Sequence, residues 1–337
     1  ARKTKRAVIL VTNDIMMRIA AAACGVEVQE YKNDQIKEYS YVGYREIKTS
    51  REIIDDIYKK QSLAPEIFAD EKPFVANEYI TLTDGNTSAL CVYRDNCIRL
   101  LKDTTAFGIR PQNRLQRFAL DALLAPAEEI PLVILRGPAG TAKTFLSMAA
   151  ALDKTYTDEF TRHTSSTSYD KIYIGRANVS SDEAFGFLPG ELEDKTRPLL
   201  GCFYSNLEDL LRKGNHEEDA QIQIQIDDMM ETGLLRVFPL AYIRGMSIKN
   251  SFIICDEAQN IGRSLIRDVV TRCGQGSKLV ILGDTNQIDV PFLDKTNSGL
   301  TYLAHNMKGS TKCAQITFTE KESVRSALAT EALNRLM

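Results

Sequence analysis

Apolar and polar residues follow three different patterns along the chain, which divide it at about residues 35 and 105. Residues 7–12 (AVILVT) form an apolar run that predicts a strand, and a helix with Asn13 or Asp14 as its N-cap is expected after it, to about residue 23. Gly25 is typical of the residue after a helix C-terminus. Because one strand and one helix cannot enclose a core, residues 1–35 are either the end of a larger domain or dock on the second segment.

The second segment, residues 36–105, changes from a helical to an alternating pattern. Residues 51–60 (REIIDDIYKK) place apolar side chains at helical spacing. Apolar and polar residues then alternate at 74–82, 89–93 and 97–101, and the intervening TDGNTS and RDN are typical turn sequences. These runs predict a small β-rich module, for which an RNA-binding barrel and a simple spacer both remain open.

In the third segment, residues 106–337, apolar strands alternate with stretches of helical character. The strands are PLVIL (131–135), KIYIG (171–175), FIIC (252–255) and KLVIL (278–282). Continuously apolar strands between helices predict an α/β fold, in which helices cover both faces of a parallel sheet. Ligands of such sheets bind at the carboxyl ends of the strands.

The loop after the first of these strands has the composition of a phosphate-binding loop. GPAGTAKT joins a strand to a helix, and its glycines let backbone N–H groups face an anion at the positive end of that helix. Lys143 would contact the β and γ phosphates of ATP, and Thr144 would hold Mg²⁺. The predicted nucleotide-binding residues of this loop are Gly137, Pro138, Ala139, Gly140, Thr141, Ala142, Lys143 and Thr144.

Ala142 departs from the usual pattern of such loops, in which a glycine precedes the lysine. We expect Ala142 to enter the helix with a negative φ, which alanine adopts without strain. A chance glycine-rich turn is the alternative that the loop alone leaves open.

Polar residues stand after two further strands at the point where each strand ends. Asp256 and Glu257 come after FIIC, and Asp284 and Gln287 come after KLVIL. Because the carboxyl ends of neighbouring parallel strands meet at one edge, these side chains are predicted to converge on the phosphate loop. Asp256 would hold Mg²⁺, Glu257 would orient or deprotonate water, and Gln287 would contact the γ-phosphate and that water. A helix cap and an ordinary polar loop are the alternatives.

Composition narrows the classes of function. The 337 residues are 44% hydrophobic, but no apolar run approaches the roughly 18 residues of a membrane span, so a cytoplasmic protein without membrane contact is expected. Seven cysteines form no C-x-x-C pair, and three histidines lack zinc-ligand spacing. A net charge of −3 excludes a polycation, so nucleic acid would need a local cluster such as Arg110, Arg114 and Arg117. The solvated face of a helix is the other interpretation of that cluster.

The third segment resembles the PhoH family. The resemblance is carried by NRLQRFALDALL, GPAGTAKT, FGFLPGELEDKTRPLL (185–200), PLAYIRGMSIKNSFIICDEAQN (239–260) and GDTNQID, and it covers about residues 106–337. It implies a single RecA-like ATPase core related to superfamily-one helicases, with ATP and Mg²⁺ as cofactors and single-stranded RNA as a partner. Because one core supplies only one wall of such an ATP site, a homo-oligomer such as a hexameric ring is expected.

Further site residues are implied by this resemblance alone. Gln112 and Gln116 stand where a helicase Q motif would, which implies adenine recognition, and SVRSALAT is similar to a family segment that makes Arg325 an arginine finger. Arg176 and Arg244 lie in stretches similar to the family's. For both, contact with phosphate or RNA and pairing with a carboxylate remain open.

The N-terminal segment AVILVTNDIMMRIAAAACGVEVQEY is similar to the closing part of a PIN nuclease domain, as fused to PhoH cores. PIN chemistry uses several carboxylates around Mg²⁺ or Mn²⁺, for which Asp14 is the candidate here; a helix cap is its other interpretation. We therefore predict an RNA-stimulated ATPase or RNA helicase. A nucleotide switch that acts on a protein partner is the alternative, as is PIN-type RNase activity if further acids precede Ala1.

Overall fold

The computed structural model describes residues 8–12, 15–29, 39–156, 168–177, 201–214, 219–291, 293–323 and 331. The chain divides into two compact units, Ala1–Glu38 and Tyr39–Met337. In the first unit, the strands β1 (Ile9–Val11) and β2 (Glu27–Gln29) are parallel, and α1 (Ile15–Ala23) connects them. Gly25 has a φ of 72°, as expected after a helix. The predicted capping residues Asn13 and Asp14 lie outside the described residues.

The second unit contains, within its described part, a parallel sheet of six strands in the order β10–β9–β11–β12–β8–β13. The four strands predicted from apolar runs lie next to one another in this sheet. The edge strands β10 and β13 were missed because Arg236 and Gln315 interrupt their apolar runs. The strands are β8 (Leu132–Arg136), β9 (Lys171–Arg176), β10 (Leu235–Pro239), β11 (Ser251–Asp256), β12 (Lys278–Gly283) and β13 (Cys313–Thr317).

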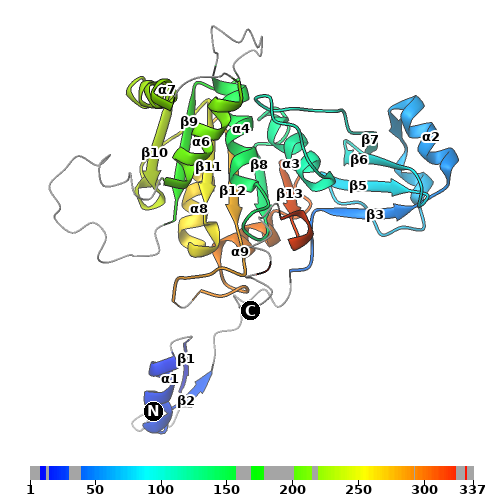
Figure 1. Cartoon of the computed structure of the whole chain (residues 1–337). Coiled ribbons are helices and arrows are strands. Elements are labelled where there is room, and N and C mark those ends of the chain that lie inside the picture. The colour runs from blue at the N-terminus through cyan, green and yellow to red at the C-terminus, as the bar shows by residue number, and fades with distance from the viewer. Residues whose placement is uncertain are drawn as a thin grey trace. The chain divides into compact units, whose positions relative to one another are not determined.

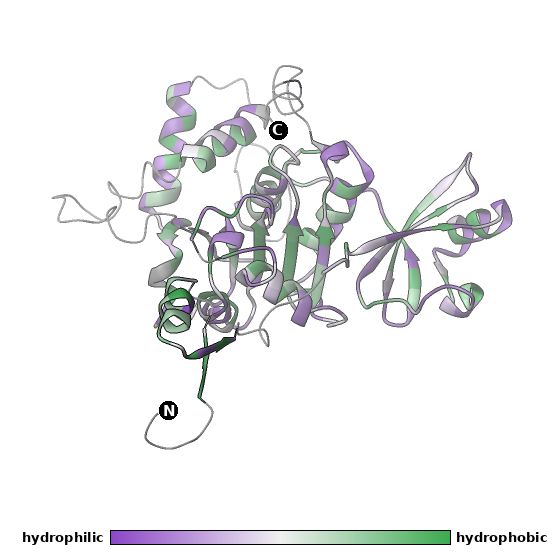
Figure 2. Cartoon of the chain, turned by 90° about the horizontal axis from the view of Figure 1, so that it is seen from below, coloured by the Kyte–Doolittle hydropathy of each residue, from purple (hydrophilic) through white to green (hydrophobic). Residues whose placement is uncertain are grey.

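Helices cover both faces of this sheet. Alternate side chains of a strand enter opposite cores: Val133 packs in one core and Ile134 in the other. The first core receives α3 (Arg114–Leu124), α4 (Lys143–Thr155), α6 (Gly201–Gly214) and α7 (Asp219–Glu231), and the second receives α8 (Arg263–Arg272) and α9 (Gly299–Asn306). The central strands are hydrophobic along their length (Figure 2). Burial on two faces explains the continuous apolar runs, and the predicted α/β fold is confirmed.

A second sheet lies beside β13 (Figure 1) and has, in the described residues, five strands in the order β3–β5–β6–β7–β4. The predicted helix α2 (Arg51–Lys60) covers one face. The strand expected at 74–82 begins only at Glu78, because Asn77 has a φ of 60°, which a strand residue cannot adopt. The strands are β3 (Tyr44–Lys48), β4 (Ser62–Leu63), β5 (Glu78–Thr83), β6 (Ser88–Arg94) and β7 (Cys97–Leu100).

Side chains join this second sheet to the first. Tyr79 of β5 stacks on Phe118 of α3 with ring centroids 4.8 Å apart. Its hydroxyl donates to Asp121 (2.8 Å), which also forms an ion pair with Arg94 (2.5 Å). Asn77 donates to two carbonyl oxygens at the start of β13. Both sheets therefore belong to one compact unit.

Two further expectations concern the cysteines and membrane-spanning helices. All seven cysteines carry free thiols. No helix in the described ranges is long and apolar enough to cross a membrane.

Candidate nucleotide-binding site

A cavity of about 270 Å³ lies at the carboxyl ends of β8, β11 and β12. Because β12 stands between the other two strands, the residues after all three meet at one edge of the sheet. The structure thus brings together the three groups of residues that were predicted to converge. The cavity is lined by residues 139–145, by Asn206 of α6, by Asp256 and Glu257, and by Gly283, Asp284 and Gln287.

The phosphate loop turns tightly between β8 and α4. Gly137 has a φ of 137°, and a Cβ there would lie 2.6 Å from the carbonyl oxygen of Phe318, so only glycine fits. Lys143 Nζ donates to the carbonyl oxygens of Gly137 (2.7 Å) and Pro138 (2.8 Å). The ammonium group therefore lies inside the loop, where it would meet phosphate oxygens.

Thr144 and Asp256 are in direct contact across this cavity. The Thr144 hydroxyl donates to Asp256 Oδ2 at 3.1 Å. Burial raises the pKa of Asp256, and the negative charge of Glu257 adds to the rise, whereas hydrogen bonds from the Glu257 N–H and from Thr144 oppose it. A divalent cation would offset the cost of burying this carboxylate, and Mg²⁺ prefers hydroxyl and carboxylate oxygens. These two residues fit the predicted metal role, and the described ranges contain no cluster of three or more His, Cys, Asp or Glu that could hold a metal.

Glu257 is held by two donors beside Asp256. Arg176 Nη2 lies 3.3 Å from Glu257 Oε1, and Gln259 Nε2 donates to Glu257 Oε2 at 2.6 Å. The Glu257 side chain makes no capping hydrogen bond to the adjoining 3-10 helix, so helix capping does not explain it. Its φ of 56° is uncommon for a residue with a Cβ, and such conformations concentrate at functional sites.

Comparisons with known sequences agree with this geometry. A family model described as PhoH-like protein matches residues 108–336. The chain is 34% identical to Protein PhoH2 of Bacillus subtilis, over 99% of the chain and 74% of that relative. The chain belongs to the PhoH family. It is also 30% identical to Protein PhoH2 of Thermobispora bispora, over 97% of the chain and 71% of the relative. A PhoH-like protein of Mycobacterium tuberculosis is 38% identical over 54% of the chain and 46% of its own length. Together with the strand order, family membership identifies the core as a RecA-like P-loop fold.

Ala142 of this PhoH core contradicts one expectation. Its φ is 65° and its ψ is 20°, a left-handed conformation, whereas a negative φ was expected. The loop must turn back here while the carbonyl of Ala142 already accepts the first helical hydrogen bond, from Leu146 N (2.9 Å). Glycine adopts this conformation freely, but a Cβ makes it unfavourable by roughly 1–2 kcal/mol. The phosphate loop of this PhoH chain is therefore strained at Ala142.

Gln259 was not predicted as a site residue, yet it connects the two polar strand ends of the PhoH core. Its side chain is fully buried. Oε1 accepts a hydrogen bond from the backbone N–H of Asp284 (3.0 Å), and Nε2 donates to the carbonyl of Gln287 (2.8 Å) as well as to Glu257. A Cβ at Gly283 would lie 2.5 Å from Gln259 Oε1, so glycine makes room for it. The sequence signal that could have indicated Gln259 is an amide side chain two residues after Glu257.

A second cavity, of about 360 Å³, adjoins the first at Ala142 and Phe145. Gln112 and Gln116, the two Q-motif candidates, also line it. Gln116 is 3% exposed, and its Oε1 accepts a hydrogen bond from the backbone N–H of Gln112 (2.8 Å). Gln116 therefore positions Gln112, whose exposed side chain is available to a ligand. Because this second cavity lies beside the phosphate loop, it is suited to a nucleotide base.

Of Arg176, Arg244 and Arg325, the structure describes the first two. Arg176 pairs with Glu257 in the site, and Arg244 Nε pairs with Asp268 at 2.8 Å, so both contact carboxylates. Arg325 and the family-like segment 185–200 lie outside the described residues.

Proposed function

We propose that this chain hydrolyses ATP with Mg²⁺ and that single-stranded RNA stimulates the hydrolysis. The observation that carries the proposal is the convergence of the phosphate loop, Asp256 with Glu257, and Asp284 with Gln287 on one cavity. Each group alone has an ordinary structural explanation. A nucleoside triphosphate site requires that these groups lie together around a metal position such as the Thr144–Asp256 contact.

Each residue has a distinct role in the proposed reaction. Lys143 would bind the β and γ phosphates, and Thr144 with Asp256 would hold Mg²⁺, which would neutralise phosphate charge. Glu257 orients and deprotonates the attacking water, and Gln287 positions the same water against the γ-phosphate. The fixed orientation of Glu257, with donors at 2.6 and 3.3 Å, supports this role.

Two substitutions separate binding from turnover. Lys143→Ala removes the phosphate contact and should abolish nucleotide binding. Glu257→Gln keeps the shape of the side chain and should bind ATP normally while turning over at least about 100-fold more slowly, as expected for loss of a general base. Fluorescent nucleotide binding and phosphate release measure the two steps.

Lys154→Ala is the matched control, because Lys154 lies in the last turn of the same helix and, among the described residues, its side chain forms only a partly exposed ion pair with Asp153. Nucleotide binding lost equally in Lys154→Ala would mean that Lys143 has no special role. Normal hydrolysis by Glu257→Gln would refute the water-activating role.

We also propose that the chain assembles with copies of itself, such as a ring of six, so that a neighbour completes the nucleotide site. A RecA-like core forms one wall of such a site, and Arg325 is the family-based candidate to reach the phosphates of an adjacent subunit. Light scattering after size exclusion, with ATP and RNA present, should detect an oligomer. A monomer under all these conditions would contradict the proposal.

A further inference from the structure

A groove of about 900 Å³ lies between the second sheet and the segment that leads into α3. Its floor is the sheet face opposite α2. On this face Thr81 of β5 pairs in register with Glu46 of β3 and with Leu90 of β6, and Thr83 pairs with Ser88. The walls come from residues 103–105, 110–114 and 117. The groove is distinct from the phosphate cavity at the carboxyl ends of β8, β11 and β12.

Three arginines line one wall of this groove. Arg114 forms an ion pair with Glu46 (2.8 Å), in which both side chains are about half exposed, and Arg117 pairs with Asp103. Arg110 is exposed and makes no hydrogen bond or ion pair in the described structure. Exposed ion pairs are weak, so an incoming anion can replace the carboxylate partners. The wall thus offers three guanidinium groups to a negatively charged ligand.

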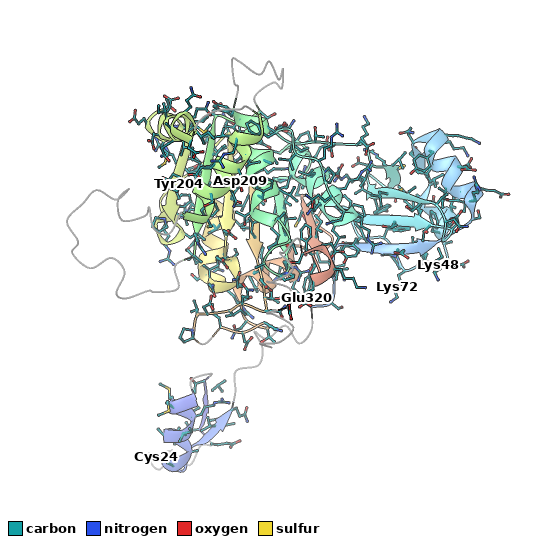
Figure 3. All side chains as sticks on the ribbon, in the orientation of Figure 1. Cys24, Lys48, Lys72, Tyr204, Asp209 and Glu320 are labelled. Carbon is teal, nitrogen blue, oxygen red and sulfur yellow. The ribbon has the colours of Figure 1, made fainter. Side chains whose placement is uncertain are left out.

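We propose that this groove binds the backbone of single-stranded RNA, with the arginines on phosphates. Arginine is well suited to phosphate oxygens, because its planar guanidinium group can donate two hydrogen bonds to one phosphate. Lys48 stands two residues beyond Glu46 on the same face of β3, at the outer end of that strand (Figure 3), and extends the positive charge along the groove. The inference rests on the proposed function and names where its RNA binds.

The groove is connected to the nucleotide-base cavity by the residues they share. Arg110 and Gln112 line both, so the segment between the groove and the base cavity forms a common wall. A ligand that moves Arg110 or Gln112 on one side of this wall would change the free energy of binding on the other, and the coupling would be reciprocal. RNA affinity should change when a non-hydrolysable ATP analogue is bound.

The phosphate contacts are tested by fluorescence polarisation with a labelled oligouridylate of about 12 nucleotides and the full chain. In the double variant Arg110→Gln/Arg114→Gln, RNA affinity should fall about tenfold or more, and the slope of log affinity against log salt should decrease by about 0.7 per lost contact. Arg51→Gln is the matched control, because Arg51 is exposed on α2, which covers the opposite face of the sheet. A double variant with the RNA affinity and salt slope of the wild type would overturn the proposal that RNA binds in the groove.

The groove and the proposed hydrolysis can fail separately. RNA binding needs no turnover, so wild-type chain that binds RNA through the groove but releases no phosphate from ATP would refute the hydrolysis alone. Normal ATP hydrolysis together with RNA binding that ignores all groove substitutions would refute the groove alone.

Discussion

Ala142 and Glu257 both adopt left-handed backbone conformations at the edge of the nucleotide cavity. Conformations of this kind are unfavourable for residues with a Cβ, and the surrounding fold has to hold them in place. The sequence could not show this, because hydrophobic pattern reports burial and period but not a backbone angle. The expectation of a negative φ at Ala142 failed for that reason.

Replacement of Ala142 by glycine should relieve the strain. We expect Ala142→Gly to raise the free energy of unfolding by up to about 1 kcal/mol, since relief of the positive φ outweighs the greater freedom of glycine in the unfolded chain. Urea denaturation measures the change. Ala139→Gly is the control in the same loop: Ala139 has no positive φ, so this variant should lose about 0.5 kcal/mol. Destabilisation by both variants would show that Ala142 is not strained.

At the scale of elements, the sequence predicted strands that are buried on both faces and missed those at sheet edges. β8, β9, β11 and β12 were found from their apolar runs, whereas β10 and β13 carry polar residues within their strands. Gln315 of β13 is buried, and its amide donates to the carbonyl of Ala304 (2.8 Å). Such a partner comes from a distant part of the chain, so local pattern cannot reveal it.

The residues of the candidate site also divide into those that the sequence could predict and those that it could not. Lys143, Thr144, Asp256 and Asp284 could be predicted because each stands at the end of a recognisable strand or in a recognisable loop. Gln259 could not, because its role depends on hydrogen bonds between residues 259 and 284–287 across two strands. The groove could not be predicted either, because the residues of its floor come together only through the register of the second sheet.

Lys278 connects two elements in the interior. It is the first residue of β12, is 0% exposed, and donates to the carbonyl oxygens of Ala122 (2.8 Å) and Ala125 (2.6 Å) at the end of α3. Burial lowers the pKa of Lys278 from its ordinary 10.5 to about 7, and the positive charge of Arg94 contributes. The unfolded chain therefore binds a proton between these two pH values that the folded chain lacks.

This difference predicts how stability depends on pH. Because the unfolded state binds more protons in this window, the contribution of Lys278 to the free energy of unfolding should rise with pH above about 7, by at most about 1.4 kcal/mol per pH unit. The test compares wild type with Lys278→Met by urea denaturation between pH 7 and pH 9. The difference between the two should change in favour of the wild type as pH rises. A difference that is constant with pH would show that Lys278 keeps its proton on folding.

At the scale of the whole second unit, the nucleotide site and the second sheet share one segment of chain. Arg110 and Gln112 border the base cavity on one side and the groove on the other. Arg114 pairs with Glu46 of β3, and Tyr79 of β5 stacks on Phe118 of α3, so the sheet and the helix are connected by side chains. The β-rich module is thus connected to the proposed base site, and RNA bound in the groove, as we propose, would affect the proposed hydrolysis.

The most direct test of this account is steady-state ATP hydrolysis with and without single-stranded RNA, with Lys143→Ala as the blank. We predict hydrolysis that RNA stimulates several-fold and that Lys143→Ala abolishes. Hydrolysis at the same rate with and without RNA would contradict the account and favour a nucleotide switch for a protein partner, and hydrolysis that survives in Lys143→Ala would place the reaction outside this site.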